Sequence, residues 1–209
     1  MQNHWEKVYQ RNAPDELGWY EKIPEPSLNL IRECKLKTDS AILLAGAGTT
    51  NLIDALLEEG YTNIIANDIS STAIAKQKER LGDQGMENIR WIVDDLTNPG
   101  LLDSLDQIDL WHDRAVLHFF IEKDLQENYF NLLRKLLRSG GYVIIAAFSL
   151  EGAEKCSGLP VRRYNSQMIS ENLGRSFELI DSFDYIHRMP NGEDRKYVYT
   201  CFQKKADPL

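Results

Sequence analysis

The sequence predicts a single-domain α/β protein built on a doubly wound, mostly parallel sheet of seven strands. After residue 40, short apolar runs alternate with longer segments in which apolar residues recur at i, i+3 and i+4. The runs are apolar on both faces, which is typical of parallel strands covered by helices on each side. Two late runs flank an Asn-Gly turn signal and predict a C-terminal antiparallel strand pair at one edge.

Residues 1–39 precede this alternation and form an N-terminal arm. The arm opens with a short segment that has aromatic and apolar residues on one helical face, and two more aromatics follow at Trp19 and Tyr20. The glycine and prolines around these two residues predict a loop that folds across a cleft. We expect the arm to cover the site and residues 40–209 to form the main domain.

The alternating part then gives its elements in order. Strands are expected at residues 41–45, 63–68, 88–93, 109–112 and 142–148. Helices are expected between them at residues 50–60, 71–82 and 124–140. Residues 149–165 are expected to form a long loop, and the antiparallel strands to lie within residues 176–189 and 194–205.

Composition narrows the classes of function. The 24 basic and 32 acidic residues are interspersed and give a net charge of −8, so no basic face for nucleic acid is expected. Three widely spaced cysteines without a CxxC pair indicate neither a disulfide framework nor a metal site. The N-terminus lacks an apolar signal region, and no run approaches the ~18 apolar residues of a membrane span. We therefore expect a cytoplasmic protein that binds neither membrane nor nucleic acid.

The end of the first strand carries the first motif. The strand ends at Ala45 and is followed by Gly46-Ala47-Gly48, where the missing Cβ atoms let a ligand approach the backbone. In an open α/β sheet, ligands bind outside the carboxyl ends of the strands. Asn51 occupies the third glycine position of a dinucleotide fingerprint, which disfavours a tightly held pyrophosphate, and a P-loop is excluded because no GKS or GKT follows.

Acidic residues follow the next two strands. Asp68 ends the second strand, 22 residues beyond Gly46, where a carboxylate accepts hydrogen bonds from a ribose diol. The alternative is that Asp68 only caps the next helix. Asp94 and Asp95 follow the third strand, where a carboxylate can accept from an adenine amine or simply lie in a solvated loop.

These motifs together resemble class I S-adenosylmethionine-dependent methyltransferases. The resemblance rests on GAG, ANDIS, VDDL and LWHDRAVLHF after four successive strands and on the terminal antiparallel pair, over about residues 40–204. The stretch HWEKVYQ, the segment LGWYEKIPEPSLNLI and DRAVL look most like the thiopurine-methyltransferase-like subgroup of small single-domain enzymes. The resemblance implies a Rossmann-like fold, S-adenosylmethionine as cofactor and S-adenosylhomocysteine as product.

The same resemblance assigns the cofactor site. The glycine turn would pass beneath the methionine part, Asp68 would bind the ribose, and Asp95 with Leu96 would meet the adenine. Many members have an acid two residues before the first glycine, whereas this chain has Leu44. The cofactor ammonium would then be recognised by backbone carbonyls or by another acid such as Asp113. The full set of expected cofactor contacts is Trp19, Ala45, Gly46, Ala47, Gly48, Asn51, Asp68, Ile69, Asp95, Leu96 and Asp113.

The segment after the fourth strand is the candidate for catalysis. Asp113 is expected near the methionine end and Arg114 near the acceptor, where related enzymes carry an arginine; the alternative is an ion pair that closes a loop. His112 is a candidate general base because its ordinary pKa lies near working pH, although a buried histidine in the core is the commoner case. His118 is expected to pack in the core.

Methyl transfer from a sulfonium is a direct SN2 displacement that needs alignment and no covalent protein nucleophile. Candidate acceptor contacts are Tyr20, Arg114, Arg162 and Arg163, the last two being a pair that could recognise an anionic or planar molecule or merely lie in solvent. Trp19 and Tyr20 either stabilise the sulfonium and exclude water or only hold the arm to the core. A small molecule is the preferred acceptor. Alternatives are a protein lysine, an inactive S-adenosylmethionine-binding module and, less favoured, a nicotinamide-dependent oxidoreductase.

Overall fold

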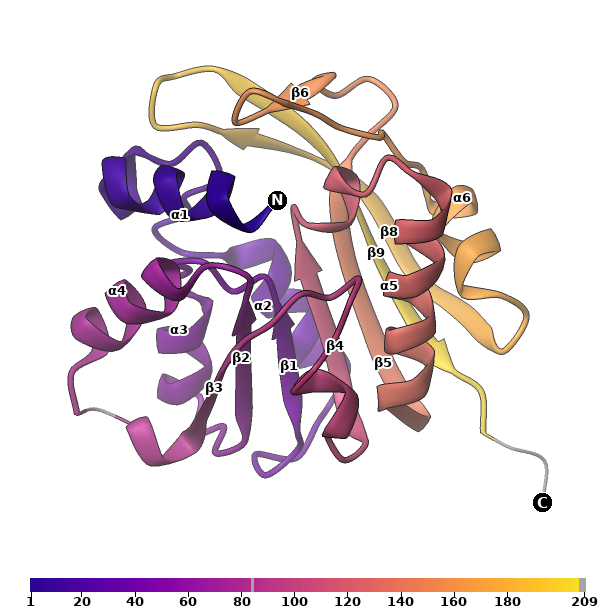
Figure 1. Ribbon diagram of the computed structural model, residues 1–209. Helices are drawn as coiled ribbons and strands as arrows, with labels where there is room; N and C mark the ends of the chain where they lie inside the picture. The colour runs from indigo at the N-terminus through magenta and orange to yellow at the C-terminus, as the bar shows by residue number, and fades with distance from the viewer. Residues whose placement is uncertain (84, 207–209) are drawn as a thin grey trace.

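The computed structural model describes residues 1–83 and 85–206 and contains a seven-stranded sheet (Figure 1). The strand order is β3-β2-β1-β4-β5-β9-β8, in which β1 to β5 run parallel, β9 is antiparallel to β5, and β8 is antiparallel to β9. The predicted mostly parallel sheet with its terminal antiparallel pair is therefore confirmed. The strands are β1 (Ile42–Ala45), β2 (Ile64–Asp68), β3 (Ile89–Val93), β4 (Ile108–Arg114), β5 (Leu137–Phe148), β8 (Phe177–Arg188) and β9 (Asp194–Lys204).

Helices cover both faces of this sheet (Figure 1). Alternate residues of β1 show the division, because Ile42 and Leu44 belong to the buried cluster on the side of α2 and α3, whereas Leu43 and Ala45 belong to the cluster on the side of α5 and α6. The helices are α1 (Gln2–Arg11), α2 (Glu25–Glu33), α3 (Leu52–Glu58), α4 (Ser71–Leu81), α5 (Lys123–Leu136) and α6 (Ser166–Leu173). Single 3-10 turns are η1 (Pro14–Glu16), η2 (Met86–Asn88), η3 (Leu102–Ser104) and η4 (Leu117–Phe119).

The region between β5 and β8 differs from the sequence-based expectation. The expected loop of residues 149–165 contains a small antiparallel pair, β6 (Lys155–Cys156) and β7 (Leu159–Pro160). Helix α6 follows, with the Asn165 side chain accepting a hydrogen bond from the Met168 amide at 2.9 Å as its N-cap. Its eight residues give only two turns of apolar spacing, too few to be distinguished from a loop in the sequence.

The topology reverses direction between β1 and β4. From β1 the chain winds outward through β2 to β3, and then returns to place β4 and β5 on the other side of β1. Ala45 is in register with Asp113, so the carboxyl ends of β1 and β4 lie next to each other. This switch point is where open α/β sheets bind ligands. No helix within the described part of the chain is long and apolar enough to cross a bilayer.

Candidate functional site

A cleft with about 1160 Å³ of empty space, including its open mouth, lies at the carboxyl ends of β1 to β4. The cleft wall includes all of the predicted cofactor contacts except Gly48 and Asp113. The predicted residues that do line it are Trp19, Ala45, Gly46, Ala47, Asn51, Asp68, Ile69, Asp95 and Leu96, together with His112, Arg114 and Tyr20.

The glycine turn at the end of β1 is tightly covered. Gly46 and Gly48 have φ values of +68° and +53°, in the left-handed region that favours glycine. A Cβ on Gly46 would lie 2.2 Å from Val116 Cγ2, and one on Gly48 would lie 2.5 Å from the Tyr9 hydroxyl oxygen. A side chain at either glycine position would therefore collide with Val116 or Tyr9, in addition to straining the backbone. Gly48 lies beneath Tyr9, which explains why it is absent from the cleft wall.

Asp68 at the end of β2 is held firmly by backbone amides. Its Oδ2 accepts from the Gly48 amide and its Oδ1 from the Ser70 amide, both at 2.8 Å. Burial raises the pKa of Asp68 to about 6, although these two hydrogen bonds oppose the rise. Each oxygen keeps a second lone pair, so the carboxylate can still accept from a ligand in the cleft. Ser70, rather than Asp68, caps α4 by accepting from the Ala73 amide at 3.1 Å.

The two acids after β3 have different surroundings. Asp94 accepts from the Gly100 amide at 2.9 Å and the Leu102 amide at 2.8 Å, so it organises its own loop. Asp95 accepts from Thr97 through one oxygen, Oδ1. Both residues line the cleft. The carboxylate of Asp95 therefore has fewer partners within the protein than that of Asp94.

The segment at the end of β4 departs from the predicted catalytic arrangement. The structure does not bring Asp113 to the cleft, since it is fully buried and accepts from the Val116 and Leu117 amides and from the Tyr129 hydroxyl. Burial raises the pKa of Asp113 to about 6, against the Tyr129 hydrogen bond. Asp113 therefore shapes the turn after β4 and does not line the cleft.

The two histidines of this segment are buried. His112 borders the cleft, with Nε2 2.9 Å from the Ser27 hydroxyl, and burial together with Arg114 lowers its pKa to about 3. So weak a base does not suit general-base catalysis at neutral pH, which favours the core alternative. His118 is fully buried against Phe119 and Phe148, as predicted.

Arg114 is directed at the N-terminal arm. Its Nη1 donates to the Trp19 carbonyl at 2.8 Å, its Nε donates to the Tyr199 hydroxyl at 2.9 Å, and its Nη2 lies 3.0 Å from Glu21 Oε1. The guanidinium also lies over the Tyr197 ring, 5.0 Å from its centroid. Arg114 thus forms its ion pair with Glu21 of the arm instead of with Asp113. Its contacts join β4 and β9 to the arm, although Trp19 lies 95 residues from Arg114 in sequence.

An aromatic roof, formed by Trp5, Tyr9, Trp19 and Phe119, covers one side of the cleft. Trp5 makes edge contacts with Phe119 at 4.8 Å and with Trp19 at 5.7 Å between ring centroids, and Tyr9 contacts Trp19 at 6.2 Å. All four residues line the cleft. Helix α1 therefore lies across the carboxyl ends of the strands, as Figure 1 shows.

Glu6 fastens this roof to the start of α4. Its carboxylate accepts from the Ser71 and Thr72 amides at 2.8 and 3.0 Å and from the Ser70 hydroxyl at 2.8 Å. Burial acts to raise the pKa of Glu6, but the hydrogen bonds from Thr72, Ser70 and Ser71 prevail and lower it to about 2. A carboxylate at a helix N-terminus is also favoured by the helix dipole.

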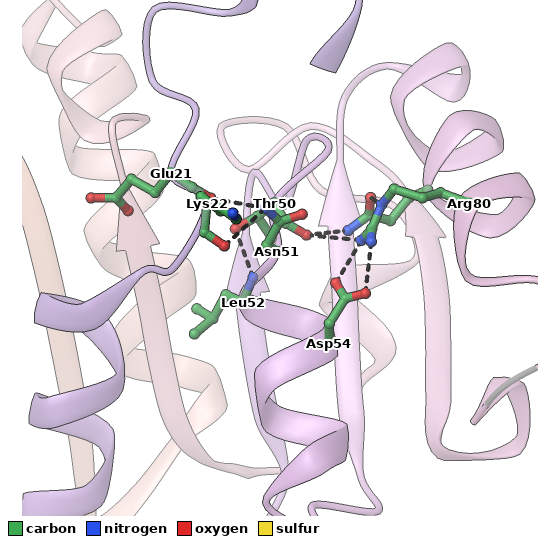
Figure 2. Close-up of polar contacts among 8 residues, drawn as sticks. Glu21, Lys22, Thr50, Asn51, Leu52, Asp54 and Arg80 are labelled. Atoms are coloured by element: carbon green, nitrogen blue, oxygen red, sulfur yellow. Dashed lines mark hydrogen bonds and ion pairs between the residues drawn. The ribbon is translucent and has the colours of Figure 1, made fainter. Parts of the chain in front are cut away.

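Asn51 fastens the arm at a second point. Figure 2 shows its side chain against the backbone of the arm, where Nδ2 donates to the Glu21 carbonyl at 2.9 Å and to the Lys22 carbonyl at 3.3 Å. The same view shows Arg80 of α4 paired with Asp54: Nη1 and Nη2 each donate to one carboxylate oxygen at 2.6 Å. This pair joins α4 to the first turn of α3. An asparagine at the third glycine position thus serves arm attachment.

The other predicted acceptor contacts lie elsewhere. Arg162 stacks on Tyr164 with 5.5 Å to the ring centroid, and Arg163 pairs with Glu154 at 3.4 Å. Neither arginine lines the cleft, so the structure does not support this part of the predicted acceptor site. Glu21 is the functional candidate absent from the sequence-based set. The sequence feature that could have indicated Glu21 is its position directly after Trp19 and Tyr20, in a loop expected to cross the cleft.

The cleft wall carries groups that suit a nucleoside cofactor. Within residues 1–83 and 85–206, no group of three or more His, Cys, Asp or Glu side chains is placed to hold a metal ion. The cleft instead offers a glycine turn, a carboxylate with free lone pairs at the end of β2 and a second carboxylate after β3. These groups fit an adenosine laid across the ends of β1 to β3.

Comparisons with known proteins find similarity to methyltransferases. The sequence model of a family described as a methyltransferase domain matches residues 42–141. Mouse EEF1A lysine methyltransferase 2 is 26% identical over 169 residues, which cover 72% of this chain and 66% of that protein's length.

Solved structures share the fold over nearly the whole chain. An S-adenosylmethionine-dependent methyltransferase from Anabaena variabilis superposes with a TM-score of 0.75 at 14% identity, covering 98% of this chain and 93% of that one. The 1,6-didemethyltoxoflavin-N1-methyltransferase of Burkholderia thailandensis, solved with 1,6-didemethyltoxoflavin and S-adenosylhomocysteine, gives a TM-score of 0.66 at 21% identity, covering 95% and 81%.

Proposed function

We propose that this chain, a class I S-adenosylmethionine-dependent methyltransferase, transfers the cofactor's methyl group to a small-molecule nucleophile held under its N-terminal arm. The observation that carries the choice of acceptor is the aromatic roof, which closes one side of the cleft with the chain's own residues. We further propose that residues 1–39 act as the cover and that residues 40–209 form the methyltransferase domain.

The order of the strands supports one orientation of the cofactor. Adenine would lie at β3 beside Asp95 and Leu96, and the ribose diol would donate to Asp68 at the end of β2. The methionine part would then cross the glycine turn and point toward β4. This path brings the sulfonium to the region bordered by Trp19 and Arg114.

The chemistry would depend on alignment. The nucleophile forms a bond to the methyl carbon as the bond from that carbon to sulfur breaks, and S-adenosylhomocysteine leaves with the electron pair. The pKa of His112 is near 3 and Asp113 lies out of the cleft, so neither of these two candidates suits the role of general base. An acceptor that is already a thiolate or a neutral amine in solution therefore fits this site best, and an amine would lose its proton to water after transfer.

The aromatic side chains favour an apolar or planar acceptor. Trp19 and Tyr20 line the cleft near the expected sulfonium, where aromatic rings would attract positive charge and exclude water. Arg114 directs two of its nitrogens at the arm and the third at Tyr199 of β9, which favours a role in positioning Trp19 and Glu21 over a role as an acceptor ligand.

A lysine side chain of a protein is the second candidate acceptor. It is favoured by the similarity to mouse EEF1A lysine methyltransferase 2, whose name states a protein substrate. An elongation factor of this type and a panel of small thiols and nitrogen heterocycles should be incubated in parallel with the chain and methyl-labelled S-adenosylmethionine. Label in the small molecules alone supports the proposal, and label in the protein would replace it with the second candidate.

An inactive cofactor-binding module is tested by the same assay. If S-adenosylhomocysteine binds but no acceptor receives label, the chain would be a binding module. For location we propose the cytoplasm, because the three cysteines are free thiols. Fractionation of cells that express the chain would check this.

A further inference from the structure

We propose that Glu21 of the N-terminal arm binds the α-ammonium group of the cofactor's methionine part. This inference rests on the proposed function, because it concerns the same cofactor in the same cleft. It identifies the residue that supplies negative charge at the end of β1, where the chain has the apolar Leu44.

The position of Glu21 is defined from two sides. Its backbone carbonyl accepts from Asn51 at the start of α3, and its side chain meets Arg114 at the end of β4. Glu21 therefore borders the cleft beside the end of β4, with its carboxylate directed at Arg114 and at His187 of β8. With the ribose at β2, the amino-acid end of the cofactor would extend past the end of β1 toward β4 and Arg114.

The other acids of the cleft are committed elsewhere. Asp68 lies at the ribose position, and Asp94 is held by the amides of its own loop. Asp95 lies after β3, at the opposite end of the cofactor path. Among the described residues of the cleft wall, Glu21 is therefore the acid at the methionine end.

The Glu21 carboxylate is buried with an incomplete set of partners. Its side chain is 9% exposed, and burial raises its pKa, which Arg114 opposes. Glu21 Oε1 and Arg114 Nη2 form an ion pair at 3.0 Å, but the pair is not aligned as a full hydrogen bond. His187 Nδ1 lies 3.8 Å from Glu21 Oε1, but burial lowers the pKa of His187 to about 4, so this ring is neutral at pH 7.

A buried carboxylate with one imperfect ion pair is unfavourable until it gains a further donor. An ammonium group has three donors and a full charge, so it supplies what Glu21 lacks. Arg114 fixes the carboxylate and the Trp19 carbonyl together, and thus acts as a positioning residue. Cofactor binding would in turn hold the arm closed.

Titration with two ligands tests the role of Glu21. S-adenosylhomocysteine carries the amino-acid group, whereas 5′-methylthioadenosine shares the adenosine and the thioether without it. Glu21→Gln should weaken S-adenosylhomocysteine by about tenfold or more, since hydrogen bonds to charged groups contribute roughly 1.5–3 kcal/mol, and should leave 5′-methylthioadenosine within about twofold. Glu25→Gln, the same charge change at an exposed position outside the cleft, should alter neither affinity.

The outcomes separate the inference from the proposed function. If wild type binds neither ligand, the proposed function fails before Glu21 is examined. If wild type binds both and Glu21→Gln weakens both equally or neither, Glu21 only holds the arm and the inference is wrong. A test without a variant is the deaminated analogue of S-adenosylhomocysteine, which keeps the carboxylate; equal affinity of wild type for it would also overturn the inference.

Discussion

The floor and the roof of the cleft are held in different ways. The floor, at the ends of β1 to β3, is organised by backbone amides of adjacent strand ends, such as the Gly48 and Ser70 amides that donate to Asp68. The roof, formed by Trp5, Tyr9, Trp19 and Phe119, depends on side-chain attachments between distant segments, chiefly Glu6 to α4, Asn51 to the arm and Arg114 to Glu21. The floor is therefore part of the sheet. We expect the roof, in contrast, to detach from the cleft when one of these attachments is removed by substitution.

The largest effect on stability is expected from removing the Arg114 attachment of the arm. Arg114→Met leaves Glu21 as an uncompensated buried charge and frees the Trp19 carbonyl, so it should reduce the free energy of unfolding by about 3–5 kcal/mol. Urea denaturation at pH 7.5 measures this change.

A matched double variant sharpens that experiment. Adding Glu21→Gln to Arg114→Met removes the stranded charge and should recover part of the lost stability. A double variant no more stable than Arg114→Met would show that the ion pair does not hold the arm.

Breaking the floor should act on ligand binding. Asp68→Asn replaces an acceptor with an amide group that meets the Gly48 or Ser70 N–H, and it removes the charge that receives the ribose hydroxyls. We expect S-adenosylhomocysteine affinity to fall about 30-fold, or about 2 kcal/mol. Calorimetry measures it, and a loss below twofold would mean that Asp68 is only a structural residue.

Acid should weaken the floor in wild type. The pKa of Asp68 is about 6, so its charge is lost as pH falls through 6, and at pH 5 about one tenth of the carboxylate remains ionised. The affinity for S-adenosylhomocysteine should therefore fall up to about tenfold between pH 7.5 and 5. In Asp68→Asn this pH dependence should be smaller, and an unchanged slope in that variant would assign it to another group.

The smallest effect concerns the outer attachment of the roof. Glu6→Gln removes a charged cap from α4 and should cost about 1 kcal/mol at pH 7, a value already reduced for its partial solvent exposure. The pKa of Glu6 is lowered from 4.5 to about 2, so its contribution is present above pH 4.5 and is lost as pH falls toward 2. Denaturation of both proteins at several pH values should show their difference shrinking in acid.

The same contrast explains what the sequence could predict. The glycine turn, Asp68 and Asp95 follow strand ends, and their positions depend on local patterns and strand order. The partners of Arg114 could not be predicted, because Glu21 and Tyr199 meet it only after folding across 93 and 85 residues. Asp113 looked like a site residue from its place after β4, but it turns inward to the Leu117 amide and the Tyr129 hydroxyl.

Residues beyond β5 show a further limit. Arg162 and Arg163 were expected in the acceptor pocket because a long loop was expected there. The β6–β7 pair lies within that length, and the two arginines contact Tyr164 and Glu154 instead. The composition of a loop therefore does not predict whether its side chains point into the cleft or away from it.

The most direct test of the central claim is thermal unfolding of the purified chain with S-adenosylmethionine, S-adenosylhomocysteine, NAD and ATP in parallel. A ligand that binds the native state raises the unfolding midpoint by mass action. The account predicts a rise with the first two ligands and none with NAD or ATP. A rise with NAD, or no rise with any ligand, would contradict a cleft built for S-adenosylmethionine.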